Sequence, residues 1–164
     1  MTLKGTNEVK HLKGEFSSCM GLSFDAVMKK VEAAEPFGNQ FCRTEGDTNV
    51  VDDCSFTIIS PKYYTDDIKT LFDEFKTTHG VNELYVRASK HAGCEHGGKR
   101  KNADDVLIIQ SLGEMEYEVN GEVYTLEEGD GLYVPAYTFI TPKVLNRRIT
   151  LEFMWYRGAV YDTI

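Results

Sequence analysis

Histidine, cysteine and carboxylate side chains gather in one short stretch in the middle of the chain. His91, Cys94 and His96 lie close together, and Asp105 follows shortly after them. Two imidazoles, a thiolate and a carboxylate are suitable ligands for Zn2+ or Fe2+. We therefore predict a divalent metal cofactor, Fe2+ or Zn2+, bound first by His91 and His96, with Cys94 and Asp105 as further ligands.

The same stretch has three alternative interpretations. The first is a solvated polar loop whose histidines bind nothing. The second is a metal-free site in which His96, or else His91, is a catalytic general base near neutral pH. The third is a redox switch through Cys94, whose thiol would be reactive because the basic residues around it favour the thiolate.

A dense basic run follows the histidines. Lys99, Arg100 and Lys101 are consecutive in a chain that carries 26 acidic and 18 basic residues, a formal net charge of -8. We interpret Lys99 and Lys101 as substrate-binding residues for a carboxylate or phosphate, against the alternative of an exposed, merely solvated loop. The acidic balance argues against nucleic acid and membrane surfaces as partners, so we expect a small-molecule ligand.

Two amphipathic helices are expected in the first half of the chain, with a short strand over residues 54–59 between them. Ser23 and Thr65 are suitable N-caps for them, and Gly80 is a suitable stop for the second. Apolar residues recur at helical spacing in both. In the first helix they are Phe24, Val27, Met28 and Val31, and in the second they are Ile68, Leu71, Phe72 and Phe75.

Beyond Gly80 the pattern changes to short strands separated by turns, which is typical of a sandwich or barrel. Asn120-Gly121 is a strong hairpin signal. Glu152 is predicted to point outward from the last strand, and Arg147 with Arg148 to mark a hairpin tip. The predicted strands of this half cover residues 84–87, 106–112, 115–119, 123–126, 132–135 and 149–155.

The segment from Val106 to Tyr156 resembles a cupin. Gly129 and Pro135 match the G-x5-P core of that family's second motif, and the strands and turns around them follow the family's order. The resemblance implies a mainly β fold, a single cupin-like double-stranded jelly-roll barrel over residues 81–164. Residues 1–80 would form an N-terminal extension carrying two helices packed on the barrel.

The metal-binding pattern of the family is not in register in this chain. Cupins commonly bind a divalent metal through His-x-His and Glu in the first motif and through His in the second. The second-motif histidine falls on Ile140, and the glutamate falls on Val106. The His-x-His positions fall on Lys99 and Lys101. The predicted metal ligands are therefore offset from the family's site.

Aromatic side chains are frequent in the predicted barrel. We expect Tyr117 and Tyr133 to bind substrate in its interior, against the alternative that they only pack in the core. Tyr137 lies just after the Pro135 corner, where the family often has glycine. We name it as a catalytic candidate beside His96, because a phenol there would narrow the mouth or hydrogen-bond a ligand.

The resemblance implies a small-molecule enzyme with its site in the barrel. The expected reaction is an oxygenation, isomerisation or lyase step on a small polar or anionic metabolite. The alternative is a non-catalytic cupin that binds or senses a sugar or metabolite, which the missing second-motif histidine favours. Jelly rolls often pair through an edge strand or an exchanged N-terminal segment, so a homodimer is expected.

The cysteines and the apolar runs bear on the compartment. We find no apolar secretory leader at the start of the sequence and no run long enough to span a bilayer. Cys19, Cys42 and Cys54 are interpreted as small buried hydrophobes. A cytoplasmic location with reduced thiols is therefore expected.

Overall fold

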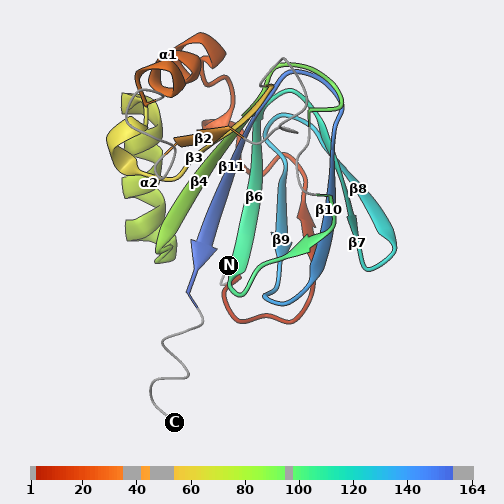
Figure 1. The fold of residues 1–164 in the computed structure, drawn as a ribbon. Helices are drawn as coiled ribbons and strands as arrows, with labels where there is room; N and C mark the ends of the chain where they lie inside the picture. The colour runs from red at the N-terminus through yellow and green to blue at the C-terminus, as the bar shows by residue number, and fades with distance from the viewer. Residues whose placement is uncertain (1–2, 35–41, 45–53, 95–97, 157–164) are drawn as a thin grey trace.

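The computed structural model describes residues 3–34, 42–44, 54–94 and 98–156. Two antiparallel sheets pack face to face, and two helices cover the outer face of the larger sheet (Figure 1). Both faces of the larger sheet are thereby buried. The architecture is the mainly β jelly roll that the sequence predicts.

In the described part of the chain, the larger sheet has seven strands and the smaller sheet has four. The order in the larger sheet is β1 (Lys10–Leu12), β9 (Gly131–Val134), β6 (Asp105–Leu112), β11 (Arg148–Trp155), β4 (Glu83–Ser89), β3 (Ser55–Ile58) and β2 (Cys42–Thr44). The order in the smaller sheet is β5 (Arg100–Lys101), β10 (Phe139–Val144), β7 (Met115–Val119) and β8 (Glu122–Leu126). Neighbouring strands in both sheets are antiparallel.

Both helices begin at the predicted caps. The hydroxyls of Ser23 and Thr65 accept hydrogen bonds from backbone N–H groups in the first turns of α1 and α2. Gly80 ends α2 in the left-handed conformation at φ 66°. Neither described helix is long and apolar enough to cross a membrane. The helices are α1 (Phe24–Ala34), α2 (Asp66–His79) and the short 3-10 helices η1 (Ser17–Cys19) and η3 (Pro61–Tyr63).

The seven-stranded sheet separates two hydrophobic cores. Leu151 and Phe153 of β11 face the helices, and the ring of Phe75 in α2 stacks on that of Phe153 at 4.1 Å between centroids. The second core lies between the two sheets and includes Ile108 of β6 and Ile140 of β10. Alternation along β11 therefore turns its other residues into the space between the sheets.

The N-terminal part of the chain supplies strands as well as helices. β1 pairs with β9, and β3 pairs with β4. The sequence shows a strand signal at β3 but none at β1 or β2, because three residues carry too little alternation to recognise. Strands from residues 1–80 and from residues 81–164 share one sheet. The division of the chain into an N-terminal extension and a barrel at residue 80 stays a prediction.

Like the two-residue β5, β10 is a barrel strand that the sequence analysis did not predict. Pro142 lies within it and donates no backbone hydrogen bond, and polar residues flank that proline. The strand nevertheless pairs with β7 on one side and with β5 on the other. Its pairing with β5 sets Ile140 opposite Arg100.

Candidate functional site inside the barrel

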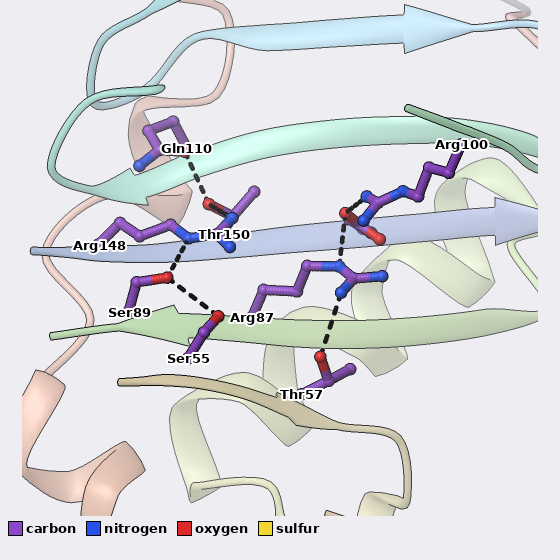
Figure 2. A network of polar contacts seen from close by, with 9 residues as sticks. Ser55, Thr57, Arg87, Ser89, Arg100, Gln110, Arg148 and Thr150 are labelled. Atoms are coloured by element: carbon purple, nitrogen blue, oxygen red, sulfur yellow. Dashed lines mark hydrogen bonds and ion pairs between the residues drawn. The ribbon is translucent and has the colours of Figure 1, made fainter. Parts of the chain in front are cut away.

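The inner face of the seven-stranded sheet carries a network of polar side chains (Figure 2). The neighbouring residues on the same strands face the helices, so alternation turns these polar groups toward the smaller sheet. Arg100 reaches them from β5 of that sheet. This polar network consists of Ser55, Thr57, Arg87, Ser89, Arg100, Gln110, Arg148, Thr150 and Glu152.

Glu152 binds two arginines inside the barrel. Its Oε1 accepts hydrogen bonds from Arg87 Nε at 2.8 Å and from Arg100 Nη2 at 2.7 Å. Arg87 also donates to the hydroxyl of Thr57. Because Arg100 belongs to the smaller sheet, this ion-pair triad joins the two sheets through one buried carboxylate.

Glu152 is ionised over the physiological pH range. Burial alone would raise the pKa of this carboxyl, because its side chain is only 3% exposed. The positive charges of Arg87 and Arg100 outweigh that effect and lower the pKa of Glu152 to about 2. A carboxylate with so low a pKa is a poor proton donor or acceptor near neutral pH.

Arg148 is buried among neutral partners. Its Nε donates to the hydroxyl of Ser89 at 2.9 Å, and its Nη1 donates to the hydroxyl of Thr150 at 3.1 Å. Thr150 in turn donates to the side-chain oxygen of Gln110. Among the described residues no carboxylate forms an ion pair with Arg148, and burial lowers its pKa. A buried guanidinium of this kind is costly unless an anion balances it.

Tyr117 faces this region from β7 of the smaller sheet. Its side chain is fully buried, and its hydroxyl has no hydrogen-bond partner among the described residues. Burial raises the pKa of Tyr117, and the charge of Arg148 opposes that shift. The phenol therefore stays neutral and keeps an O–H that a bound acceptor can use.

The charges of the polar network do not cancel among the described residues. Arg87, Arg100 and Arg148 carry three positive charges, and Glu152 carries one negative charge. The described part of the network therefore has an excess of two positive charges, 3 − 1. Within the described residues, this excess of positive charge favours a small anion over a cation.

Comparison with known proteins bears on the fold. No protein-family model and no curated protein matches the sequence. Among solved structures, the ribosomal oxygenase YcfD from Escherichia coli, in complex with cobalt and 2-oxoglutarate, superposes with a TM-score of 0.69 at 14% identity, covering 94% of this chain and 50% of that one. Salicylate 1,2-dioxygenase from Pseudaminobacter salicylatoxidans superposes with a TM-score of 0.50 at 14% identity, covering 85% of this chain and 34% of that one. The fold is cupin-like.

The likeness is one of architecture. At these identities it shows the fold alone, and the chain spans about half the length of YcfD. A further YcfD structure, with cobalt and succinic acid, gives a TM-score of 0.66 at 15% identity over 91% of this chain and 48% of that one. The chemistry of this chain therefore has to be argued from its own residues.

The positions at which cupins hold a metal carry other chemistry here. Ile140 replaces the second-motif histidine, and Val106 replaces the glutamate; both are buried between the sheets. Ile140 pairs directly with Arg100, whose guanidinium points into the same space. Alkyl side chains are not ligands, and a guanidinium repels a cation, so the residues at these positions do not fit a divalent metal.

The proposed metal ligands separate into two places. His91 Nδ1 lies 3.1 Å from Cys94 Sγ, and Cys54 joins them. Asp105 lies at the far end of β11 from this cluster, where it accepts backbone hydrogen bonds from Gly5 and Ala136. The structure thus brings His91 and Cys94 together but leaves Asp105 apart. His96 lies outside the described residues.

The three predicted tyrosines have different surroundings. Only Tyr117 lies between the sheets. Tyr133 lies in the core beneath the helices, packs edge-on against Trp155 and donates to a backbone oxygen of Thr6, so the expectation that it binds substrate inside the barrel does not hold. Tyr137 is exposed and has a positive φ of 61°, an uncommon conformation for a large side chain.

The two predicted anion-binding lysines flank an aromatic ring at the surface. The ammonium groups of Lys99 and Lys101 lie 4.8 Å and 5.2 Å from the centroid of the exposed Phe139 ring. Both lysines are exposed, and they sit on either side of Arg100 in the chain. Their role in binding substrate stays a prediction.

Three further expectations are wrong. Glu152 points inward instead of outward, and Arg148 is buried in β11 while only Arg147 is exposed at the turn. Cys54 and Cys94 form a disulfide instead of remaining as separate thiols. Alternation shows that a strand has a polar and an apolar face, but it does not show that the polar face points inward when the barrel interior is itself polar.

Proposed function

We propose that this chain binds a small carboxylate inside its cupin-like barrel, with Arg148 and Tyr117 contacting the anion. The observation that carries the proposal is the environment of Arg148. The guanidinium is buried, and the described contacts supply only the hydroxyls of Ser89 and Thr150. A carboxylate would balance its charge and accept its remaining N–H donors.

Tyr117 supports the same ligand from the opposite sheet. Its buried hydroxyl needs an acceptor, and a carboxylate has two oxygens to share between a guanidinium and a phenol. A buried guanidinium without a described carboxylate partner and a buried hydroxyl without a described acceptor are each unfavourable in the absence of a ligand. Groups that are costly in this way are often kept because they bind a ligand.

The interior is better equipped to bind an anion than to transfer protons. The pKa of Glu152 is about 2, and that of Tyr117 is raised by burial, so neither group exchanges protons readily near neutral pH. The family's metal positions carry Ile140 and Val106. We therefore place binding or sensing of a small metabolite first.

Catalysis is the second candidate function. It rests on the architecture shared with YcfD and salicylate 1,2-dioxygenase, an oxygenase and a dioxygenase by their names. An oxygenase, isomerase or lyase step would require a reactive group beyond the polar network, and His96 is the residue named for that role. Catalysis would be established if the wild type converts a bound carboxylate to product and His96→Ala does not.

A ligand screen with two matched variants tests the proposed function. Thermal shift would be measured for the wild type, Arg148→Gln and Arg147→Gln with a library of small carboxylates, sugars and neutral metabolites. Arg147 is the matched control because it is adjacent in the chain but exposed. Carboxylates should stabilise the wild type and Arg147→Gln but not Arg148→Gln. Selective stabilisation by neutral sugars, unchanged in Arg148→Gln, would contradict the proposal.

A further inference from the structure

Cys54, His91 and Cys94 form a cluster at one end of the seven-stranded sheet. Cys54 immediately precedes β3, and the other two residues follow β4. The two cysteines form a disulfide with a Cα–Cα distance of 5.7 Å. We name these three residues the Cys-His cluster. Neither the polar network nor the proposed carboxylate site uses them.

Hydrogen bonds to the backbone carbonyls of both cysteines hold the Cys-His cluster together independently of the sulfur–sulfur bond. The N–H of Lys90 donates to the carbonyl of Cys54 at 2.8 Å. The hydroxyl of Ser89 donates to the carbonyl of Cys94 at 3.0 Å. The two cysteine backbones would therefore remain neighbours after reduction of the disulfide.

The imidazole of His91 is the third donor of the cluster. Its Nδ1 lies 3.1 Å from Cys94 Sγ, and one ligand atom from each of the three residues lies within 4.8 Å of the others. Cys94 is buried, whereas His91 is exposed, so solvent reaches the cluster from the imidazole side. Two thiolates and an imidazole suit Zn2+, and a water molecule commonly completes a site with three protein ligands.

We propose that the reduced protein binds one Zn2+ through Cys54, Cys94 and His91, and that formation of the disulfide expels it. In reduction, a phosphine or dithiol donates two electrons and the disulfide takes up two protons to give two thiols. Zn2+ then displaces both thiol protons and binds neutral His91 through one ring nitrogen. In the reverse direction, a disulfide oxidant takes two electrons from the thiolates, the sulfur–sulfur bond forms and Zn2+ is released.

The histidine distinguishes this cluster from a purely structural crosslink. A disulfide requires only two cysteines at a suitable separation, and Cys54 and Cys94 already meet that requirement. The imidazole in contact with one of the sulfurs is not required for the crosslink. It does add the nitrogen ligand that zinc sites with cysteine commonly contain.

Zinc stoichiometry in the two redox states tests this proposal. The full chain would be reduced with a phosphine or oxidised with glutathione disulfide, mixed with ZnCl2, freed of excess metal and analysed for bound zinc. We expect one Zn2+ per chain in the reduced protein and none in the oxidised protein. Cys54→Ser, Cys94→Ser and His91→Ala should each abolish stoichiometric binding. Cys19→Ser is the matched control and should bind normally, because Cys19 is buried elsewhere.

Two measurements on the wild type keep the test independent of how the variants fold. Co2+ in place of Zn2+ should give sulfur-to-cobalt charge-transfer absorption in the reduced protein. Zn2+ should also protect Cys54 and Cys94 from alkylation, as located by peptide mass spectrometry. No zinc in the reduced wild type would overturn the proposal, and so would full binding by folded His91→Ala. Neither result depends on whether the barrel binds a carboxylate.

Discussion

The guanidinium of Arg100 on the four-stranded sheet lies 2.7 Å from the carboxylate of Glu152 on the seven-stranded sheet. The same carboxylate oxygen also accepts from Arg87. One buried carboxylate therefore pairs with two arginines inside the barrel and connects the two sheets. Removing this acid would leave both cations without their shared partner.

We expect Glu152→Gln to destabilise the protein by about 3–5 kcal/mol, because breaking a buried ion pair leaves uncompensated charge. The amide has nearly the same shape as the carboxylate, so packing changes little. Urea unfolding of the wild type and the variant at neutral pH measures the difference. Glu118→Gln is a suitable control, since Glu118 is exposed on β7 and should change stability by less than about 0.5 kcal/mol.

The advantage of the wild type over Glu152→Gln should depend on pH. The pKa of Glu152 is about 2 in the folded protein, against an ordinary value of 4.5 for a glutamate. The stabilisation that the ionised carboxylate contributes is therefore complete above pH 4.5 and is on the order of 3 kcal/mol. This stabilisation should be lost as the pH falls from about 4.5 to about 2. Melting both proteins across this range checks the window. A pH-independent difference would show that the charge of Glu152 is not the cause.

Tyr117→Phe should separate stability from binding. The hydroxyl of Tyr117 is buried without a described partner, and an unsatisfied buried hydroxyl costs about 1–3 kcal/mol. The ligand-free variant should therefore be as stable as the wild type or more stable, while its affinity for a carboxylate falls. Urea unfolding and calorimetric titration measure the two quantities. A large loss of stability would mean that the hydroxyl already has a partner in the protein.

Arg148→Met and Arg87→Met should differ sharply. Ser89 and Thr150 keep other hydrogen bonds when Arg148 is removed. The free energy of unfolding of Arg148→Met should therefore lie within about 1 kcal/mol of the wild-type value or above it. Arg87 pairs with Glu152, so Arg87→Met should cost about 3 kcal/mol or more. Parallel thermal melts compare them. Equal losses in the two variants would argue against an unpaired charge at Arg148.

Two glycines test the turn geometry of the barrel. Gly113 and Gly121 both have positive φ, at 75° and 81°. A Cβ at Gly113 would overlap the carbonyl oxygen of Arg147, whereas a Cβ at Gly121 would meet nothing within 4 Å. Gly121→Ala should cost about 1–2 kcal/mol from backbone strain alone, and Gly113→Ala clearly more. Similar melting temperatures for both variants would contradict this geometry.

The sequence predicts the elements of this fold better than it predicts the site. Caps at Ser23 and Thr65 and the hairpin at Asn120-Gly121 act locally, so they can be recognised without knowledge of the fold. β10 is missed because Pro142 interrupts its pattern. Local signals of this kind carry no information on which strands meet across the barrel.

The candidate site depends on contacts between distant segments. Arg148 and Glu152 look like surface charges on an alternating strand, and only the sheet pairing turns them inward. Cys54 is 40 residues from Cys94 in the chain, and nothing in the sequence marks it as the partner. Tyr117 faces the interior as the apolar face of β7 indicates, and its role in binding substrate stays a prediction.

Calorimetric titration with a matched ligand pair tests the central claim most directly. A carboxylate that stabilises the wild type would be compared with its primary amide, which has nearly the same shape but no charge. The carboxylate should bind the wild type and Arg147→Gln, the amide should bind neither appreciably, and Arg148→Gln should bind neither ligand. Equal affinity for acid and amide, or an undiminished affinity of Arg148→Gln for the acid, would contradict a carboxylate site at Arg148.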